Sequence, residues 1–214
     1  MAERYPGYDV LDKRHTLSWN EQTRRVVDER LAVPREPRFF GEEEFATLSA
    51  LCDRIVPQPQ HRPPIPTAAL IDDKMHRGDG HGYRNAKLPP MGEAWRRGLE
   101  ALDEEARAAH GASFRELDAE RQDELLRRAH QGELRGPAWD GMPSDLFFKA
   151  RVLHDVTRAY YAHPTAWSMV GWGGPASPRG YVRMGFNRRD PWEAIELKDG
   201  DDPAEVYAEN RRVR

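Results

Sequence analysis

The stretch from Asp145 to Tyr181 changes character at His163-Pro164, and this break constrains the possible folds most strongly. Before the break, the run DLFFKARVLHDVTRAYY repeats apolar residues every three or four positions, which predicts an amphipathic helix with Ser144 as its N-cap. After it, the run TAWSMVGWGGPASPRGY sets tryptophans among glycines and prolines without a helical or strand period, so no regular element is expected there. Aromatic side chains in irregular backbone need a surface to pack on, either this chain's own core or another protein.

The composition indicates that part of the chain lies outside any single core. Of the 214 residues, 38% are hydrophobic and 32% are charged, which is too little apolar material to bury every segment. The net charge of -3 gives no overall field that would favour nucleic acid or an anionic membrane as a partner. One cysteine excludes an intrachain disulfide framework, and Cys52 falls on the apolar face of a predicted helix, so we interpret it as a small buried side chain.

The sequence contains no segment typical of membrane insertion, because no stretch approaches the roughly 20 apolar residues that span a bilayer. The N-terminal residues lack the apolar region of an export signal. Arg24-Arg25 is followed by Val26-Val27 and then directly by charged residues, which makes it a poor twin-arginine signal. We therefore expect a cytoplasmic protein without direct membrane insertion, unless a partner carries it out of the cytoplasm.

Three parts are expected along the chain. Residues 1–38 form an N-terminal arm with scattered aromatic residues, and residues 163–214 form an irregular C-terminal arm rich in aromatic residues, glycine and proline. Leucine, isoleucine and valine are scarce in the C-terminal arm, so it cannot alone offset the roughly 1–2 kcal/mol of backbone entropy lost per ordered residue. We expect both arms to take much of their order from a partner protein. The alternatives are a disordered N-terminal tail and aromatic residues that cover one end of the chain's own bundle.

Residues 39–162 show helical periodicity and no convincing strand pattern, so they are expected to form about five helices. Residues that commonly begin or end helices mark the boundaries: Thr67, Asp118 and Ser144 at N-terminal ends, and Pro57, Gly111 and Gly132 at C-terminal ends. The predicted fold class is therefore all-α, a small helical bundle with long irregular N- and C-terminal arms.

Motifs that carry chemistry are weak or missing. Asp72, His76 and His81 form the best metal-like cluster, but two of the three lie around a glycine-rich turn, and a solvated helix end is the favoured interpretation. The sequence has no Gly-x-Ser-x-Gly nucleophile elbow, no Gly-x-Gly-x-x-Gly dinucleotide fingerprint and no Cys-x-x-Cys-His haem motif. We therefore assign no catalytic, cofactor-binding or metal-binding residue, and by elimination the chain is expected to serve another protein's chemistry.

Several features in a fixed order resemble the gluconate 2-dehydrogenase subunit 3 family over about residues 39–186. They are FFGEEEFATLSALCDRIVP, then PTAALID (66–72), then GLEALDEEARAAHGASFRELDAERQDELL (98–126), an apolar helix with Tyr160-Tyr161, and the tail VGWGGPASPRGY. No single one of these motifs is specific, and the resemblance depends on the whole series.

The resemblance implies a small subunit paired with a large flavoprotein of the glucose–methanol–choline oxidoreductase class. Such a partner oxidises a sugar, a sugar acid or a polyol at its FAD, and in many complexes it passes electrons to a multihaem cytochrome c. The small subunit would have no cofactor of its own and would assist maturation, stability or export of the large one. Family members often carry an N-terminal twin-arginine signal, and this chain has an unrelated polar arm instead.

Aromatic residues and neighbouring glycines outside the bundle are the candidate partner-binding residues, because aromatic side chains dominate interface energetics. The set is Phe39, Phe40, Trp167, Trp172, Gly173, Gly174, Pro175, Arg179, Gly180 and Tyr181. A further hypothesis is that Arg179, Tyr181 or Arg183 reaches the mouth of the partner's active site and shapes substrate access. The alternative function is an independent enzyme with a pocket between bundle and tail that uses His76, His81, His154 or His163.

Overall fold

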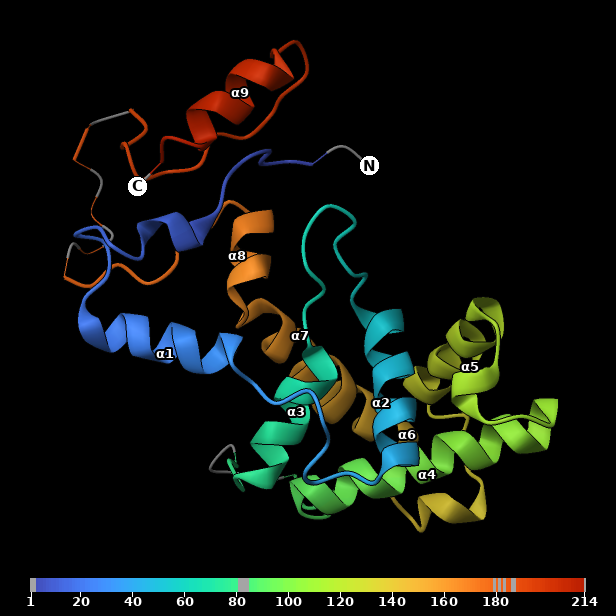
Figure 1. Ribbon diagram of the computed structural model, residues 1–214. Helices are drawn as coiled ribbons and strands as arrows, with labels where there is room; N and C mark the ends of the chain where they lie inside the picture. Colours follow the sequence, from blue (N-terminus) through green and yellow to red (C-terminus); the bar gives the residue numbers. More distant parts are fainter. Residues whose placement is uncertain are drawn as a thin grey trace. The chain divides into compact units, whose positions relative to one another are not determined.

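The computed structural model describes residues 3–80, 85–178, 180, 182, 184–185 and 188–213. Every regular element in these residues is helical (Figure 1), and their one extended pairing is an isolated parallel bridge between Trp19 and Ser177. The all-α prediction is thereby confirmed. No described helix combines the length and the apolar character that crossing a bilayer requires.

Most of the helices are short, and 3₁₀ or π turns lie between several of them. In chain order the elements are η1 (Val10–Lys13), α1 (Glu21–Leu31), α2 (Glu42–Ile55), α3 (Thr67–His76), α4 (Met91–His110), η2 (Phe114–Glu116), α5 (Ala119–Gln131), η3 (Pro137–Trp139), α6 (Ser144–Phe147), η4 (Phe148–Leu153), α7 (His154–Tyr161), α8 (Pro164–Met169) and α9 (Pro203–Asn210).

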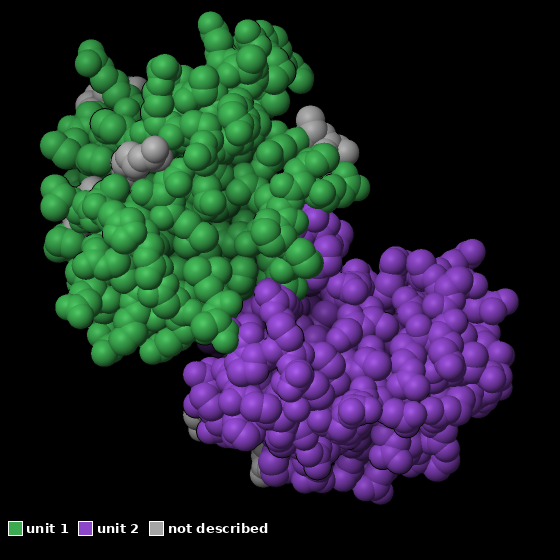
Figure 2. Space-filling view, in the orientation of Figure 1, with its two compact units in different colours: residues 1–32, 60–65, 161–214 green, residues 33–59, 66–160 purple. Residues whose placement is uncertain are grey.

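The chain divides into two compact units (Figure 2). Unit 1 combines residues 1–32, 60–65 and 161–214, and unit 2 combines residues 33–59 and 66–160. Both ends of the chain therefore belong to the same unit. The predicted parts, 1–38, 39–162 and 163–214, divide the chain along its length, whereas the chain passes between the two units after residues 32, 59, 65 and 160.

Unit 2 is built on α2 and α4, which pack against each other and against α5. In α4, Trp95, Leu99, Leu102 and Ala106 are buried on one face, as their helical spacing predicts. Gly111 ends this helix with φ 74°, a left-handed conformation that glycine adopts without a steric penalty. The same signal ends α5 at Gly132, and the Asp118 side chain caps its start by accepting from the amide of Arg121, so these predicted boundaries are confirmed.

The apolar helix expected from Asp145 to Tyr161 contains a π turn, η4, between α6 and α7. The extra residue of a π turn changes the helical register. Phe147 and Phe148 are both buried as a result. Ser144 is not the N-cap that was predicted: it is the first residue of α6, Pro143 precedes it at the cap position, and its buried hydroxyl has no hydrogen-bond partner. Thr67 likewise begins α3 instead of capping it.

Unit 1 has an apolar core made of residues from both ends of the chain. Its buried members are Tyr8, Val10, Trp19, Val27, Trp167 and Val213. The C-terminal segment was expected to need contacts from outside itself. The N-terminal residues of the same chain supply such contacts, so a partner protein is not required as their source.

The segment after His163-Pro164 begins with a regular element, and the expectation of irregular backbone there was wrong for its first six residues. Pro164 interrupts the preceding helix and then occupies the first turn of α8, where its missing N–H is not needed. His163 caps α8 by accepting from the amide of Thr165. Trp167 on α8 is thereby directed into the core of unit 1, where it is 3% exposed.

Candidate partner-binding surface

Exposed large apolar side chains of the described residues are confined to unit 1. There are eight of them, namely Leu17, Leu31, Tyr161, Val170, Trp172, Val182, Met184 and Tyr207. Unit 2 contributes none among its described residues, although it contains most of the buried apolar side chains. Exposed apolar side chains mark an interaction site when they lie together, whereas scattered single ones need no explanation.

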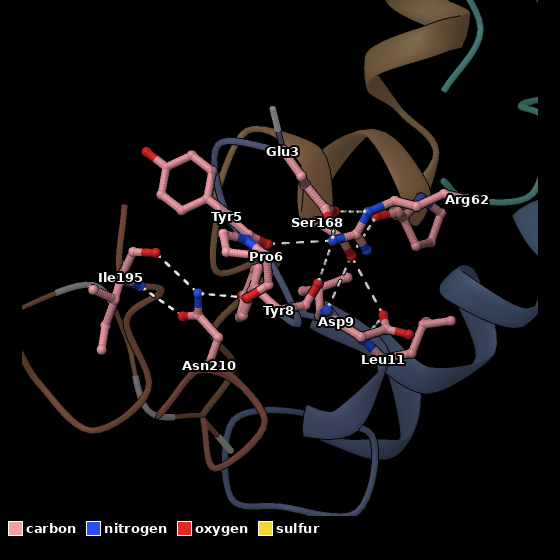
Figure 3. A network of polar contacts seen from close by, with 12 residues as sticks. Glu3, Tyr5, Pro6, Tyr8, Asp9, Leu11, Arg62, Ser168, Ile195 and Asn210 are labelled. Carbon is pink, nitrogen blue, oxygen red and sulfur yellow. Dashed lines mark hydrogen bonds and ion pairs between the residues drawn. The ribbon is translucent and has the colours of Figure 1, made fainter. Parts of the chain in front are cut away.

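Asn210 at the end of α9 joins the two ends of the chain within unit 1 (Figure 3). Its side chain is fully buried, and its amide nitrogen donates to the carbonyl oxygens of Pro6 and Ile195, each at 2.9 Å. Its side-chain oxygen accepts from the amide of Ile195 at 2.8 Å. These three bonds satisfy all but one of the hydrogen-bonding positions of an asparagine side chain, so Asn210 fixes the C-terminal helix to the N-terminal segment.

Arg62 lies in the loop 60–65 and adds a third segment to the same network (Figure 3). Its guanidinium donates to the carbonyl oxygen of Tyr8 at 2.8 Å and to a carboxylate oxygen of Glu3 at 2.7 Å. Nearby, the hydroxyl of Ser168 on α8 accepts from the amide of Val10 at 3.0 Å. Unit 1 is therefore held by polar contacts between segments that are far apart in the sequence.

Lys13 is a buried cation that contacts residues from the C-terminal part of unit 1. Its side chain is fully buried, and its ammonium donates to the carbonyl oxygens of Gly173 at 3.2 Å and Trp192 at 2.6 Å. The ammonium also lies 5.5 Å from the centre of the Tyr8 ring, within the range of a cation–π interaction. Lys13 thus ties the N-terminal segment to two separate C-terminal segments.

A tight turn immediately after Lys13 presents Leu17 to solvent. The amide of Thr16 donates to the Lys13 carbonyl at 3.0 Å, and the amide of Ser18 donates to the Thr16 hydroxyl at 3.2 Å. Ser18 and Trp19 are buried, yet Leu17 between Thr16 and Ser18 is 86% exposed. The backbone that carries this leucine is therefore fixed although its side chain contacts little of its own chain.

Met184 is presented in a comparable way from the C-terminal half of unit 1. The buried carboxylate of Asp190 accepts from the amide of Met184 at 2.9 Å. The amide of Asp190 in turn donates to the carboxylate of Glu193 at 2.8 Å. Met184 itself is 81% exposed, so Asp190 holds the backbone of a side chain that points away from the core.

Leu17 and Met184 line the same groove, which we call the Leu17–Met184 groove. It has a volume of about 790 Å³ and is lined by His15, Thr16, Leu17, Ser18, Pro178, Met184 and Trp192. A second depression of about 880 Å³ shares His15 with it and has a charged lining that includes Arg14, Arg24 and Asp28. The groove combines an apolar lining with charged surroundings, as protein interfaces do.

The predicted partner-binding aromatic residues have different surroundings in the structure. Phe40 and Trp167 are covered by this chain's own residues, with 4% and 3% of their surface exposed. Phe39 is half-buried beneath the guanidinium of Arg96, 4.4 Å from its ring centre. Trp172 packs edge-on against Trp167 but stays 42% exposed. Of the four, Trp172 offers the most surface to a partner.

The neighbouring predicted residues serve the packing of unit 1 or lie outside the described part. A Cβ atom on Gly174, which has φ 70°, would lie 2.9 Å from a methyl group of Val10, so this glycine permits a close approach within the chain itself. Gly173 accepts from Lys13, Pro175 is half-buried, and Gly180 has φ 80°. Arg179 and Tyr181 lie outside the described residues, as does Arg183.

The histidines of the alternative hypothesis are distributed over both units. His163 belongs to unit 1, where it is buried and caps α8. His76 and His154 belong to unit 2, and His81 lies outside the described residues. The other member of the metal-like cluster, Asp72, accepts three backbone amides, those of Arg38, Phe39 and Phe40. In the described part of the chain, no group of acidic, histidine or cysteine side chains has the arrangement of a metal site.

Asp155 is a deeply buried charge with several partners in unit 2. Its carboxylate accepts from the indole of Trp95 at 3.0 Å and from the ammonium of Lys74 at 3.2 Å, and Arg151 lies 3.4 Å away. Burial lowers the pKa of Lys74 below its ordinary value, while the facing carboxylate of Asp155 acts in the opposite direction. A buried carboxylate with this set of donors is a satisfied structural charge.

The model of one protein family, Gluconate 2-dehydrogenase subunit 3, matches residues 42–174, more than half of the chain. The match takes in most of unit 2 and the α8 region of unit 1, and it leaves out residues 1–41 and 175–214. The chain has no significant match among curated proteins or among solved structures.

The residues of the Leu17–Met184 groove were not predicted. Leu17 stands alone among polar residues in the run RHTLSW, and Met184 stands in the run YVRMGF. Neither belongs to a periodic pattern, and the groove forms only when segments more than 150 residues apart meet. The sequence contained one signal for this groove, namely the isolated aliphatic residue Leu17 among polar ones.

Proposed function

The chain belongs to the gluconate 2-dehydrogenase subunit 3 family, and on this premise we propose that it is a non-catalytic small subunit of a dehydrogenase complex. Its partner is a large FAD-dependent oxidoreductase of the glucose–methanol–choline class that acts on a sugar, a sugar acid or a polyol. The FAD belongs to that partner, and a cytochrome c is a further candidate member of the complex. The small subunit binds the large one and stabilises it or assists its maturation.

The observation that supports this proposal is the confinement of exposed large apolar side chains to unit 1. An isolated leucine on a protein surface needs no explanation, but several apolar residues on one unit of a strongly charged protein favour a docking role. Unit 1 also presents these side chains from a backbone held by Asn210, Arg62 and Lys13. A surface that is ordered before binding loses less conformational entropy when a partner docks.

The buried polar groups of unit 2 support a structural role for that unit. The carboxylates of Asp72 and Asp155 are occupied by backbone amides and by Trp95, Lys74 and Arg151. A general acid, base or nucleophile needs access to a substrate, and these groups lie in the interior of the unit. We therefore assign the scaffold role to unit 2 and the contact with the partner to unit 1.

Co-expression with a glucose–methanol–choline flavoprotein encoded beside this chain tests the proposal. We expect the two proteins to elute together from a size-exclusion column, and the flavoprotein to keep more of its FAD than when it is expressed alone. The control is the flavoprotein expressed with an unrelated helical protein of similar size. Separate elution, together with equal FAD content in the presence and absence of the small subunit, contradicts the proposal.

A further inference from the structure

Of the three most exposed large apolar side chains of the described residues, two line the Leu17–Met184 groove. Leu17 is 86% exposed, Met184 is 81% exposed, and Val182, two residues before Met184, is 83% exposed. Leu17 and Met184 come from opposite ends of the chain. The two side chains thus bring exposed apolar surface together on one groove of unit 1.

The backbone on each side of the groove is fixed without help from the exposed side chains themselves. On one side the Thr16 hydroxyl and the Lys13 carbonyl hold the turn that carries Leu17. On the other side the buried carboxylate of Asp190 holds the amide of Met184. The groove therefore presents ordered apolar side chains, and burying them under a partner requires little further ordering of the backbone.

Exposed positive charge near the groove comes from the segment between Met184 and Trp192, which both line it. In the run 13–19, Lys13 is buried against backbone carbonyls and Arg14 pairs with Asp28, so neither offers its charge to a partner. In the segment after Met184, the side chains of Arg188 and Arg189 are exposed. The carboxylates that follow, Asp190 and Glu193, accept backbone amides, and Asp190 is buried. Arg188 and Arg189 are therefore the exposed charged side chains of the described residues from 184 to 193.

We propose that the Leu17–Met184 groove receives a segment of the large subunit that carries carboxylates next to at least one bulky apolar side chain. The apolar side chain packs between Leu17 and Met184, and the carboxylates face Arg188 and Arg189. A groove of about 790 Å³ accommodates several side chains of such a segment, whereas a bilayer presents a flat surface. This inference rests on the proposed function, since the segment belongs to the proposed partner.

The test uses the co-expressed complex and single substitutions in the full chain. We expect Leu17→Asp and Met184→Asp each to raise the dissociation constant for the large subunit by about tenfold or more, because a carboxylate then replaces a central apolar contact. Leu17→Ala should have a smaller effect in the same direction. The control is Ala119→Asp, which adds the same carboxylate at an exposed position in the first turn of α5 in unit 2, and it should change the dissociation constant by less than about twofold.

The charge component is tested separately. Replacing Arg188 and Arg189 by glutamate should slow association with the large subunit more than it speeds dissociation, and raising NaCl from about 50 to about 500 mM should slow wild-type association similarly. An association rate that responds to neither change contradicts the acidic character of the partner segment. Binding of the isolated wild-type chain to phosphatidylserine vesicles, lost in Leu17→Asp while the protein complex persists, assigns the groove to a membrane and overturns the proposal.

The outcomes separate this inference from the proposed function. If the wild-type chain does not bind the flavoprotein, the proposed function fails and the groove proposal fails with it. If the wild-type chain binds and Leu17→Asp and Met184→Asp bind equally well, only the groove proposal fails. Leu17 and Met184 are highly exposed, so the variants should keep the wild-type circular dichroism spectrum and thermal midpoint, and a loss of binding then reports on the interface.

Discussion

Cys52 in α2 carries a thiol that burial makes unreactive. Its side chain is 2% exposed, and burial raises the pKa of the thiol far above its ordinary value, with the neighbouring charge of Asp53 adding to the effect. The thiolate is the reactive form of cysteine, and a thiol held neutral in the interior is inert. The sequence had indicated this role through the position of Cys52 on an apolar helical face.

Cys52 should report on the unfolding of unit 2. At about pH 8 a thiol reagent should fail to label native protein and should label it quickly in urea, because only the unfolded thiol has a pKa near 8.5. Above that pH the unfolded thiol loses its proton and the folded one keeps it, so the free energy of unfolding should fall as pH rises. The decline should be smaller in Cys52→Ala, measured by urea titration at about pH 8 and about pH 10. Labelling of the native protein at the rate of a free thiol contradicts the prediction.

Helix packing in unit 2 depends on the absence of a side chain at Gly98 in α4. A Cβ atom there would lie 2.1 Å from the tip of the Phe147 ring. Phe147 cannot move aside easily, since it packs edge-on against Trp95 and Trp139, with ring centres 5.6 and 5.8 Å away. A glycine in a helix interior is usually unfavourable, and here it permits α4 and α6 to approach each other.

We expect Gly98→Ala to lower the stability of unit 2. Alanine gains about 1 kcal/mol in helix propensity, but overpacking costs about 1–3 kcal/mol, so a net loss of up to about 2 kcal/mol is expected in urea unfolding. Phe147→Leu in the same chain should recover part of the loss, because the shorter side chain relieves the clash. The coupling is measured by a double-mutant cycle over the two single variants and the pair. Stabilisation by Gly98→Ala alone contradicts this packing.

Individual helices were predictable to the extent that their signals are local. The glycines at 111 and 132 and the Asp118 cap act on their own helices, and the structure has them where they were expected. The π turn η4 was missed because a change of helical register leaves no signal in the spacing of apolar residues. The helix α8 was missed although its signals are local, namely Pro164 in its first turn and the cap by His163. Ser144 was placed one helix position too early, because α6 begins at Ser144 and Pro143 holds the cap position.

The composition of unit 1 could not be predicted from the sequence, because its bonds join distant positions. Asn210 and Pro6 are 204 residues apart, and Ser168 and Val10 are 158 apart. Periodicity reports on neighbours along the chain and is silent about such pairs. Lys13 is an example. Lysine side chains are usually exposed, but this one is fully buried in the fold. The groove depends on the same long-range contacts, so it could not be predicted from the sequence either.

The structure predicts that the two units respond separately to damage. Asn210→Ala removes both donors and the acceptor that join Pro6 and Ile195, and each buried group left without a partner costs about 1–3 kcal/mol. Because Asn210 lies within unit 1, both ends of the chain should lose protection from hydrogen exchange together, even though they are far apart in sequence. Glu205→Ala, at an exposed position of the same helix α9, is the matched control and should leave exchange unchanged.

Hydrogen exchange measured by mass spectrometry on peptides from both units tests whether the units respond separately. In Asn210→Ala, peptides from α1 and α8 should exchange faster while peptides from α2 and α4 keep their wild-type rates. Gly98→Ala should produce the opposite pattern, because its clash with Phe147 lies inside unit 2. Faster exchange throughout the chain in both variants contradicts separate units and indicates a single cooperative fold. The selective pattern indicates instead that each unit opens without the other.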